Sequence, residues 1–587
     1  MDNLNAASRK ANLNAASRKA VLMTPKKRAK QFPDGLFHAS ADRLLCTACT
    51  VIVDHQRKDS CVKHLESNGH KKRVERRKKA ETKKANLQVT LSESFSKLTE
   101  SQREKQSTLI GLTEAFASAN IPLYALGNLR LKTFLEANLK TCGAIPEPSN
   151  LRRNYLKKAF EVHFDSLKKK LKDVKATAIV CDETTDVEDR YVLNVLAVPT
   201  CEKGEFHLKS FLLDCVVLER TNFKTVSDSV ISVLQKYEIP TLRVCAFVTD
   251  NATYMSKAWK CSLRPLFLNA VHVTCSAHLL NLVNEVWSSS FPEVNCLVSK
   301  VKKTFTACPA RKARFKQFLR DQGESETLPP EPVITRWNTW FEAALYHAEH
   351  LNDYSEFFDR EAAGSSSLNL SEARDLSLSS EVESGLAELK TYAPHLVSTL
   401  TKYEGNSILA HEVSDEFALL IEWLETPATR EDIPSKTRTA LIKSVQKLRS
   451  YLSTDSVAKF RQPAIDFFRA CRAFDPVRAA TNNIAPQFVI GNIPWFEDDD
   501  RAIAELKLYL STATSFIPPE NPIAFWYKVS AQFPKLSEIA LICLSVPVNS
   551  VQAERSFSLY SDVLQDNRRS IKECNLPVYN LLYQNDV

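Results

Sequence analysis

The sequence lacks the long apolar segments of a membrane-spanning or secreted protein. No continuous apolar run approaches the ~18 residues that a membrane-spanning helix needs, and the first residues contain no apolar signal block. Its 15 cysteines are scattered singly over 587 residues, which favours reduced thiols in an intracellular protein over a disulfide scaffold. We therefore expect no membrane partner and, from the chain length, three or more domains.

Acidic residues are scarce in the N-terminal part of the chain. Residues 1–90 hold 21 Lys and Arg against 8 Asp and Glu, a net charge of +13, and because the whole chain carries +9, the other 497 residues sum to −4. The clusters PKKRAK (25–30) and KKRVERRKK (71–79) are of the kind that contacts phosphate or directs a protein to the nucleus. This charge distribution indicates a nucleic-acid partner and a nuclear location, although a solvated basic tail would have the same composition. A perfect tandem repeat, NLNAASRKA at 3–11 and 12–20, opens the chain and predicts no fold.

Two cysteines and two histidines have the spacing of a zinc finger. Cys46, Cys49, His64 and His70 follow the pattern Cys-x2-Cys-x14-His-x5-His. Two thiolates from a tight turn and two imidazoles from a helix can complete a tetrahedron around Zn²⁺, which makes a closed, structural site. His55 and Cys61 lie close enough in sequence to be alternative ligands.

A basic run continues directly from the expected finger helix, as phosphate contacts by a DNA-docking finger require. Its candidate DNA-binding residues are Lys71, Lys72, Arg73, Arg76 and Arg77.

The rest of the chain alternates between helical and strand patterns. Apolar residues recur every three or four positions in 156–171, which predicts a helix. Three strand-like runs, a helix at 224–237 and two further strand-like runs follow between 176 and 275, and they predict a mixed α/β sheet. The remainder up to about 525 is predicted to be helical, with a Ser-rich surface loop at 364–385.

Two of the predicted strands end in an acid. ATAIVCD ends at Asp182 and RVCAFVTD ends at Asp250. If the two strands are neighbours in the sheet, the two carboxylates lie close together and form a hard oxygen site that suits Mg²⁺. Either acid alone is more often a turn or cap residue, but together with a basic N-terminal part they indicate phosphodiester chemistry.

Five motifs in order carry a resemblance to a known family. They are VCDETTD (180–186), VTDNATYM (248–255), CSAHLLNLV (275–283), TRWNTW (335–340) and VNSVQAERSFS (548–558). In this combination the chain resembles the hAT superfamily of DDE transposases, and its finger resembles that of CGG-repeat-binding proteins. The resemblance covers nearly the whole chain.

The resemblance implies an α/β RNase H-like catalytic domain interrupted by a large all-α insertion. It implies that Glu554 is the third acid beside Asp182 and Asp250, with Mg²⁺ or Mn²⁺ as the catalytic ion. It also implies that His278, of a Cys-x-x-His motif with Cys275, lies near the DNA end, and that Arg336 and Trp337 contact an extruded base there. The implied partners are transposon terminal inverted repeats and target DNA, bound by a homo-oligomer that is at least a dimer.

These features divide the chain into six expected segments. They are a disordered basic tail (1–36), a zinc-finger DNA-binding domain (37–80), a helical DNA-binding or dimerisation region (85–172), the first part of the catalytic domain (173–288), the all-helical insertion (289–525), and the last part of the catalytic domain with a dimerisation motif (526–587).

Two questions stay open at this level. Glu285 falls 35 positions after Asp250, whereas Glu554 falls 304 positions after it, so sequence spacing alone favours Glu285 as the third acid. The family resemblance favours Glu554. The expected function is cut-and-paste DNA transposition by metal-dependent strand cleavage, flanking hairpin formation and strand transfer; the alternative is a domesticated DNA-binding protein that acts in transcription or chromatin without catalysis.

Overall fold

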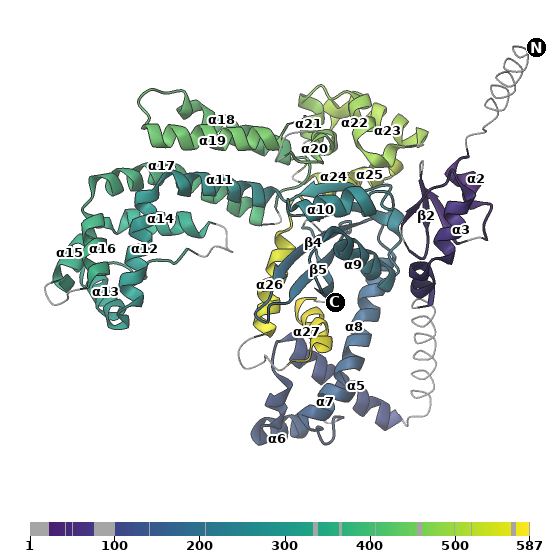
Figure 1. Cartoon of the computed structure of the whole chain (residues 1–587), viewed down its shortest axis with the longest axis horizontal. Coiled ribbons are helices and arrows are strands. Elements are labelled where there is room, and N and C mark those ends of the chain that lie inside the picture. The colour runs from purple at the N-terminus through teal and green to yellow at the C-terminus, as the bar shows by residue number, and fades with distance from the viewer. Residues whose placement is uncertain are drawn as a thin grey trace, which may run out of the picture. The chain divides into compact units, whose positions relative to one another are not determined.

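Figure 1 shows the helices and strands of the computed structural model. The chain divides into two compact units. One comprises residues 1–161 and 257–268, the other 162–256 and 269–587, and each is considered by itself. The structure describes residues 23–33, 35–40, 43–49, 51–75, 100–139, 141–205, 207–332, 338–362, 367–405, 407–453, 455, 461–497, 499–517, 519, 521–564 and 571–585.

The first unit contains a small finger fold. Strands β1 (Phe37–Ser40), β2 (Arg43–Cys46) and β3 (Ile52–Val53) form an antiparallel sheet in chain order. Helix α3 (Lys58–Glu66) follows, and residues 68–75 are helical again. The buried core of this fold is small, and three of its six members are cysteines, at positions 46, 49 and 61.

The disordered tail predicted over residues 1–36 does not extend to residue 36, because its last part is folded. Helix α2 (Pro25–Ala29) lies within it, and its buried Arg28 donates to the carbonyl oxygens of His55 (2.8 Å) and Gln56 (2.9 Å). Three apolar residues pack on the finger core: Ala29, Phe32 and Leu36. The basic composition of PKKRAK is typical of a solvent-exposed segment, so it did not predict that Arg28 is buried within the fold.

Most of the other described residues of the first unit are helical. The helices are α5 (Glu100–Ser118), the 3-10 helix η1 (Leu123–Gly127), α6 (Leu129–Asn138), α7 (Pro148–Asn154) and the first turns of α8 (Leu156–Lys172). In α8 the predicted apolar face is found, with buried Leu156, Leu167 and Leu171 at helical spacing. Residues 257–268, which include the π-helical turn η3 (Trp259–Leu263), belong to this unit.

The second unit is built on a mixed five-stranded sheet of order β6-β5-β4-β7-β8. Its strands are β4 (Thr177–Thr185), β5 (Tyr191–Pro199), β6 (Phe211–Leu218), β7 (Val244–Thr249) and β8 (Val271–Thr274). The first three form an antiparallel meander, whereas β7 is parallel to β4 and β8 is parallel to β7. The predicted run of three strands, a helix and two strands is therefore found.

Helices from both ends of this unit either follow its strands in the chain or pack on the sheet. They are α9 (Phe223–Lys236), α10 (Thr253–Ala258), α11 (Ser276–Ser290), α26 (Val551–Val563) and α27 (Leu576–Gln584), with the 3-10 turns η2 (Thr241–Arg243) and η8 (Glu573–Asn575). α26 packs on β4 and β5, and α27 packs on β6, so the C-terminal residues complete a sheet formed by residues 177–274.

Between α11 and α26 the described residues are helical or irregular. The helices are α12 (Pro292–Thr306), α13 (Pro309–Asp321), α14 (Thr339–Glu349), α15 (Leu351–Ala362), α16 (Leu368–Ser377), α17 (Ser380–Glu404), α18 (Val413–Ala428), α19 (Ser435–Tyr451), α20 (Ile465–Cys471), α21 (Pro476–Thr481), α22 (Pro486–Asn492), α23 (Asp500–Thr512), α24 (Pro522–Val529) and α25 (Pro534–Leu544). Three short 3-10 turns interrupt them: η4 (Arg472–Phe474), η5 (Pro494–Phe496) and η6 (Ala513–Ser515).

The Ser-rich surface loop predicted at 364–385 is wrong over most of its length. Residues 368–377 form α16 and residues from 380 onward form α17. Leu370 and Ala373 of α16 and Val382 of α17 are fully buried at helical spacing. The serines hid this pattern because they occupy the solvent face and the helix boundaries, where their low helix propensity costs little.

Within the described residues, every helix is too short or too polar to span a lipid bilayer.

Candidate functional site

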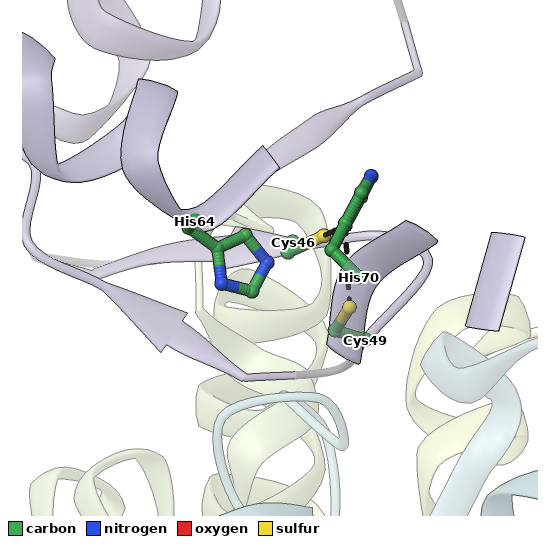
Figure 2. A group of neighbouring side chains, drawn as sticks. All are labelled: Cys46, Cys49, His64 and His70. Carbon is green, nitrogen blue, oxygen red and sulfur yellow. Dashed lines mark hydrogen bonds between the residues drawn. The ribbon is translucent and has the colours of Figure 1, made fainter. Parts of the chain in front are cut away.

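The four predicted zinc ligands come together in the finger (Figure 2). Cys46 ends β2, Cys49 lies in the turn after it, His64 lies in the last turn of α3, and His70 lies in the helical segment that follows. Their ligand atoms all lie within 4.8 Å of one another. His70 Nδ1 lies 3.4 Å from Cys46 Sγ and 3.3 Å from Cys49 Sγ, so the histidine faces both thiols.

The chemistry of this group fits a bound cation. His64 Nε2 is buried without a hydrogen-bond partner among the described residues, which is costly unless an ion supplies one. Burial, then the adjacent Cys46, raises the pKa of the Cys49 thiol to about 11. Burial, then His70 and Arg73, lowers the pKa of His64, which keeps its ring neutral. Two neighbouring cysteine sulfurs and a neutral imidazole are donors that suit Zn²⁺.

The two alternative ligands do not join this group. Cys61 is fully buried in the finger core, where its Sγ contacts the carbonyl oxygen of Asp54 at 3.6 Å. The His55 ring contacts the side chain of Gln56 near the surface.

The basic run after the finger is described up to residue 75. Lys71, Lys72 and Arg73 are exposed on the helical segment that carries His70. Arg73 also donates to the carbonyl oxygen of Cys49 at 2.7 Å, so it holds the turn between the cysteines. Arg76 and Arg77 lie outside the described residues.

The first two candidate catalytic acids lie at the same edge of the second sheet. Strands β4 and β7 are parallel neighbours in which Val180 pairs with Val248. Asp182 and Asp250 each follow two residues after this pair, so the register brings them side by side. Asp182 Oδ1 accepts from the Glu183 amide at 2.9 Å, and Asp250 Oδ1 accepts from the Ala252 amide at 3.2 Å.

The third candidate, Glu554, reaches this edge from α26, although it lies 372 positions after Asp182 in the chain. Polar bonds hold α26 against the sheet. Asn194 of β5, which pairs with Asp182, donates to Ser556 Oγ at 2.6 Å, and Tyr560 donates to Asp186 Oδ2 at 2.9 Å. At its N-terminus, the Ser550 amide donates to Cys275 Sγ at 3.3 Å.

The electrostatics of the three acids reflect their proximity. Burial, then the Asp250 carboxylate, raises the pKa of Asp182 to about 8. Burial, then Asp182, Glu404 and Asp250, raises the pKa of Glu554 to about 9. Burial raises the pKa of Asp250, and the neighbouring His278 opposes this. Like charges that repel one another in a half-buried site are the arrangement that a divalent cation stabilises.

The acids are spread more widely than ligands of a single ion. Among the described residues two groups of His, Cys, Asp or Glu have all their ligand atoms within 4.8 Å, the finger and a surface group of Glu324, His350 and Asp353, and the acid trio is not one of them. In the surface group, one ring nitrogen of His350 pairs with both carboxylates, which accounts for their proximity.

Sequence patterns missed three further residues at this edge. Tyr254 of α10 donates to Glu183 Oε2 at 3.0 Å. Glu183 contributes to the raised pKa of Asp182 and of Asp250, whereas burial, then Asp250, Glu183 and Asp182, raises the pKa of Tyr254. Glu404, at the end of α17, acts on Glu554. The motifs DETTD and DNATYM contain the first two beside the predicted acids, but nothing in the sequence around Glu404 distinguishes it from other helix-end acids.

The other predicted site residues are placed as follows. Cys275 caps α11 by accepting from the His278 amide, and the thiol is buried. Glu285 is exposed further along α11 and is not among the groups that act on the pKa of the acid trio. Arg336 and Trp337 lie outside the described residues.

Comparison with known proteins identifies three regions of the chain. Family models match at residues 19–76 (CGGBP1 N-terminal domain), 99–158 (CGGBP1 helical domain) and 505–584 (hAT family C-terminal dimerisation region). CGG triplet repeat-binding protein 1 of mouse and of human are each 34% identical over 142 residues, which is 24% of this chain and 81% of the relative.

These matches confirm the resemblance inferred from the motifs, at both ends of the chain. The finger and the helices after it correspond to the two CGGBP1 domains, and the hAT region contains α26 and α27. The chain therefore belongs to the family of CGG triplet repeat-binding protein 1 and joins the two domains of that family to the C-terminal dimerisation region of the hAT family.

Proposed function

We propose that this chain is a nuclear cut-and-paste DNA transposase. The finger binds Zn²⁺ and recognises transposon ends, and the acidic edge of the second sheet cleaves DNA strands and joins them to target DNA. The observation that carries the proposal is the convergence of Asp182, Asp250 and Glu554, which come from β4, β7 and α26, at one edge of the sheet.

The fold around the acids supports this proposal. The RNase H-like domain implied by the family resemblance agrees with a mixed sheet whose central strand β4 carries the first acid and whose parallel neighbour β7 carries the second. The third acid returns on α26 after the helical insertion. A binding module has no need for three mutually repelling carboxylates, because each raises the cost of burying the others.

Asp182, Asp250 and Glu554 would hold Mg²⁺ or Mn²⁺. When bound, such ions activate an attacking oxygen and stabilise the leaving oxygen of a phosphodiester. The protein's own contribution is orientation: the amides of Glu183 and Ala252 fix the two aspartates, and the α26 contacts of Asn194 and Tyr560 fix the helix that carries Glu554. His278, beside Asp250, can carry a proton or contact the DNA end.

The other regions have separate tasks. The finger, with Lys71, Lys72 and Arg73 exposed beside it, recognises DNA ends, in keeping with relatives named for binding CGG triplet repeats. The C-terminal region, matched by a dimerisation model, joins two copies. Arg336 and Trp337 contact an extruded base during hairpin formation on the flanking DNA.

The test is cleavage of a labelled duplex, taken from the DNA that flanks the coding sequence, by purified single variants in Mg²⁺. Asp182→Asn, Asp250→Asn and Glu554→Gln should each bind the duplex and cut nothing, a loss of more than ~10³-fold. Glu285→Gln, an exposed acid on α11, is the matched control and should retain activity. An inactive Glu285→Gln beside an active Glu554→Gln would assign the third acid to α11 and refute the role of α26.

A second function is favoured by one observation. The curated relatives match only the N-terminal domains, over 24% of this chain. A domesticated DNA-binding protein that regulates transcription or chromatin would use those domains without cleavage. If the unmodified protein cuts no DNA end, including the ends that flank its own gene, this second function replaces the first.

A further inference from the structure

The helical insertion is bonded directly to the helix that carries Glu554. Asn549 Nδ2 donates to the carbonyl oxygen of Tyr403 at 2.7 Å, and Arg555 Nη2 donates to the carbonyl oxygen of Glu404 at 2.9 Å. These consecutive carbonyls end α17, where helix carbonyls lack partners within the helix. The two donors flank Glu554 on either side, so the insertion fixes the first turn of α26.

Arg555 is an oriented cation at the edge of an acidic site. Its side chain is exposed, and its charge opposes the effect of burial on the pKa of Glu404. A guanidinium has five N–H donors in a planar fork, and the bond to Glu404 uses one of them. The remaining donors match the geometry of a phosphate group.

A DNA strand that approaches this edge meets strong repulsion. Glu554 is repelled by Asp182, Glu404 and Asp250, and Glu183 repels both aspartates. Each phosphate of the strand adds a further negative charge. Divalent ions offset part of this repulsion at the acids themselves. A cation fixed one residue from Glu554 can offset it at the neighbouring phosphate.

We propose that Arg555 binds a backbone phosphate of the DNA strand presented to the acidic edge, with the carbonyl oxygen of Glu404 orienting its guanidinium. The inference rests on the proposed DNA-cleaving function and adds to it a substrate contact supported by the insertion. Arg555 thereby gives the insertion a direct part in the site: a shift of the last turn of α17 moves the phosphate-binding group.

The alternative is that Arg555 only stabilises the packing of α17 against α26 and binds no phosphate. Arg555→Gln separates the two roles, because its amide N–H₂ can still donate toward the Glu404 carbonyl while the positive charge is lost. Arg555→Lys keeps the charge and loses the fork. Arg243 is the matched control: it also donates to a helix-end carbonyl, that of Lys172 at 2.5 Å, but it precedes β7, at the end opposite Asp250.

The experiment measures binding of the full chain to a labelled duplex from the flanking DNA over a series of salt concentrations, without divalent metal. Arg555→Gln should reduce the slope of log affinity against log salt by about 0.9, the value for one phosphate contact. Arg555→Lys should keep most of the slope, and Arg243→Gln should keep all of it. A slope unchanged by Arg555→Gln overturns the proposal, whether or not the melting temperature falls.

The same variants are then assayed for cleavage in Mg²⁺. Arg555→Gln should raise KM or lower kcat/KM by about tenfold, with partial rescue by Arg555→Lys. If the unmodified protein never cleaves, the proposed function fails, whereas the salt series still decides whether Arg555 contacts phosphate.

Discussion

The finger and the acidic edge are two candidate metal sites assembled in opposite ways. The finger takes its four ligands from 25 consecutive residues, and two of them lie in one turn. The acidic edge takes its three from positions that span 373 residues and from two strands and a helix. A local site can form wherever its own short segment folds, whereas the acidic edge exists only once the whole second unit has folded.

The two sites also differ in how they are closed. The finger buries both sulfurs and a histidine among a few apolar side chains, which suits a structural ion with no open position. The acidic edge leaves its carboxylates half-buried, close enough to repel one another and open to a substrate. The finger should therefore govern binding and the acidic edge should govern cleavage, and the following predictions test that division.

The largest effect on DNA binding is expected from the finger. Cys49→Ser should release Zn²⁺ and lower affinity for the transposon end by about 10³-fold, the lower range of the ratio between specific and non-specific DNA binding. The second unit should keep its melting temperature. Zinc content and binding isotherms measure the change, and Cys61→Ser, a neighbouring core cysteine, is the control. Equal zinc content in Cys49→Ser would exclude Cys49 as a ligand.

Trp337→Ala should impair DNA cleavage and leave DNA binding intact, whereas the finger variant should impair binding. Base–aromatic stacking contributes ~1–3 kcal/mol, so end cleavage or hairpin formation should fall by about 5–150-fold while initial binding is retained. Melting temperature is recorded alongside cleavage. A core tryptophan would instead cost ~3–5 kcal/mol of stability, and an unfolded variant would place Trp337 in the core.

Removal of one acid should stabilise the metal-free protein at high pH. The pKa of Asp182 rises from 3.8 to about 8 on folding, so the folded chain holds a proton that the unfolded chain lacks. The free energy of unfolding therefore falls as pH rises between these values. The Asp182→Asn variant has no carboxyl group at this position to ionise, so its free energy of unfolding should not fall in this way. At pH 9 in EDTA its melting temperature should exceed that of the unmodified protein by about 2 °C or more.

Added Mg²⁺ should reverse that order, because it stabilises the unmodified protein and has little effect on Asp182→Asn. Glu285→Gln should behave like the unmodified protein in both conditions. Identical pH dependence in Asp182→Asn and the unmodified protein would show that the three carboxylates do not repel one another as described.

The smallest effect concerns the exposed lysines beside the finger. Replacing Lys71 and Lys72 together by Ala should reduce the salt slope of DNA binding by about 1.8, at 0.9 for each phosphate contact. Binding titrations at 50–200 mM salt measure it, with exposed Lys507→Ala as the control. A slope unaffected by the double substitution would assign the phosphate contacts to other basic residues.

Local chemistry made the finger predictable from sequence. The spacing of Cys46, Cys49, His64 and His70 leaves few ways to arrange four donors, and their side chains meet as expected. The apolar period of α8 and the succession of strands and helix along residues 176–275 are likewise visible in the sequence, because burial of one face imposes a 3.6-residue or two-residue period. The Ser-rich segment was misjudged because composition outweighed a short apolar period at Leu370 and Ala373.

The sequence by itself determined the four candidate ligands of the finger, a strand that contains Asp182 and a strand that ends just before Asp250, and the family to which the chain belongs. Only the tertiary structure decided that β4 and β7 are parallel neighbours, that Glu554 rather than Glu285 faces the two aspartates, and that Glu404 and Arg555 meet at the same edge. The physical reason is distance along the chain. Side chains within one turn or helix are positioned by local geometry, but residues hundreds of positions apart are brought together by strand register and helix packing, which no short motif encodes.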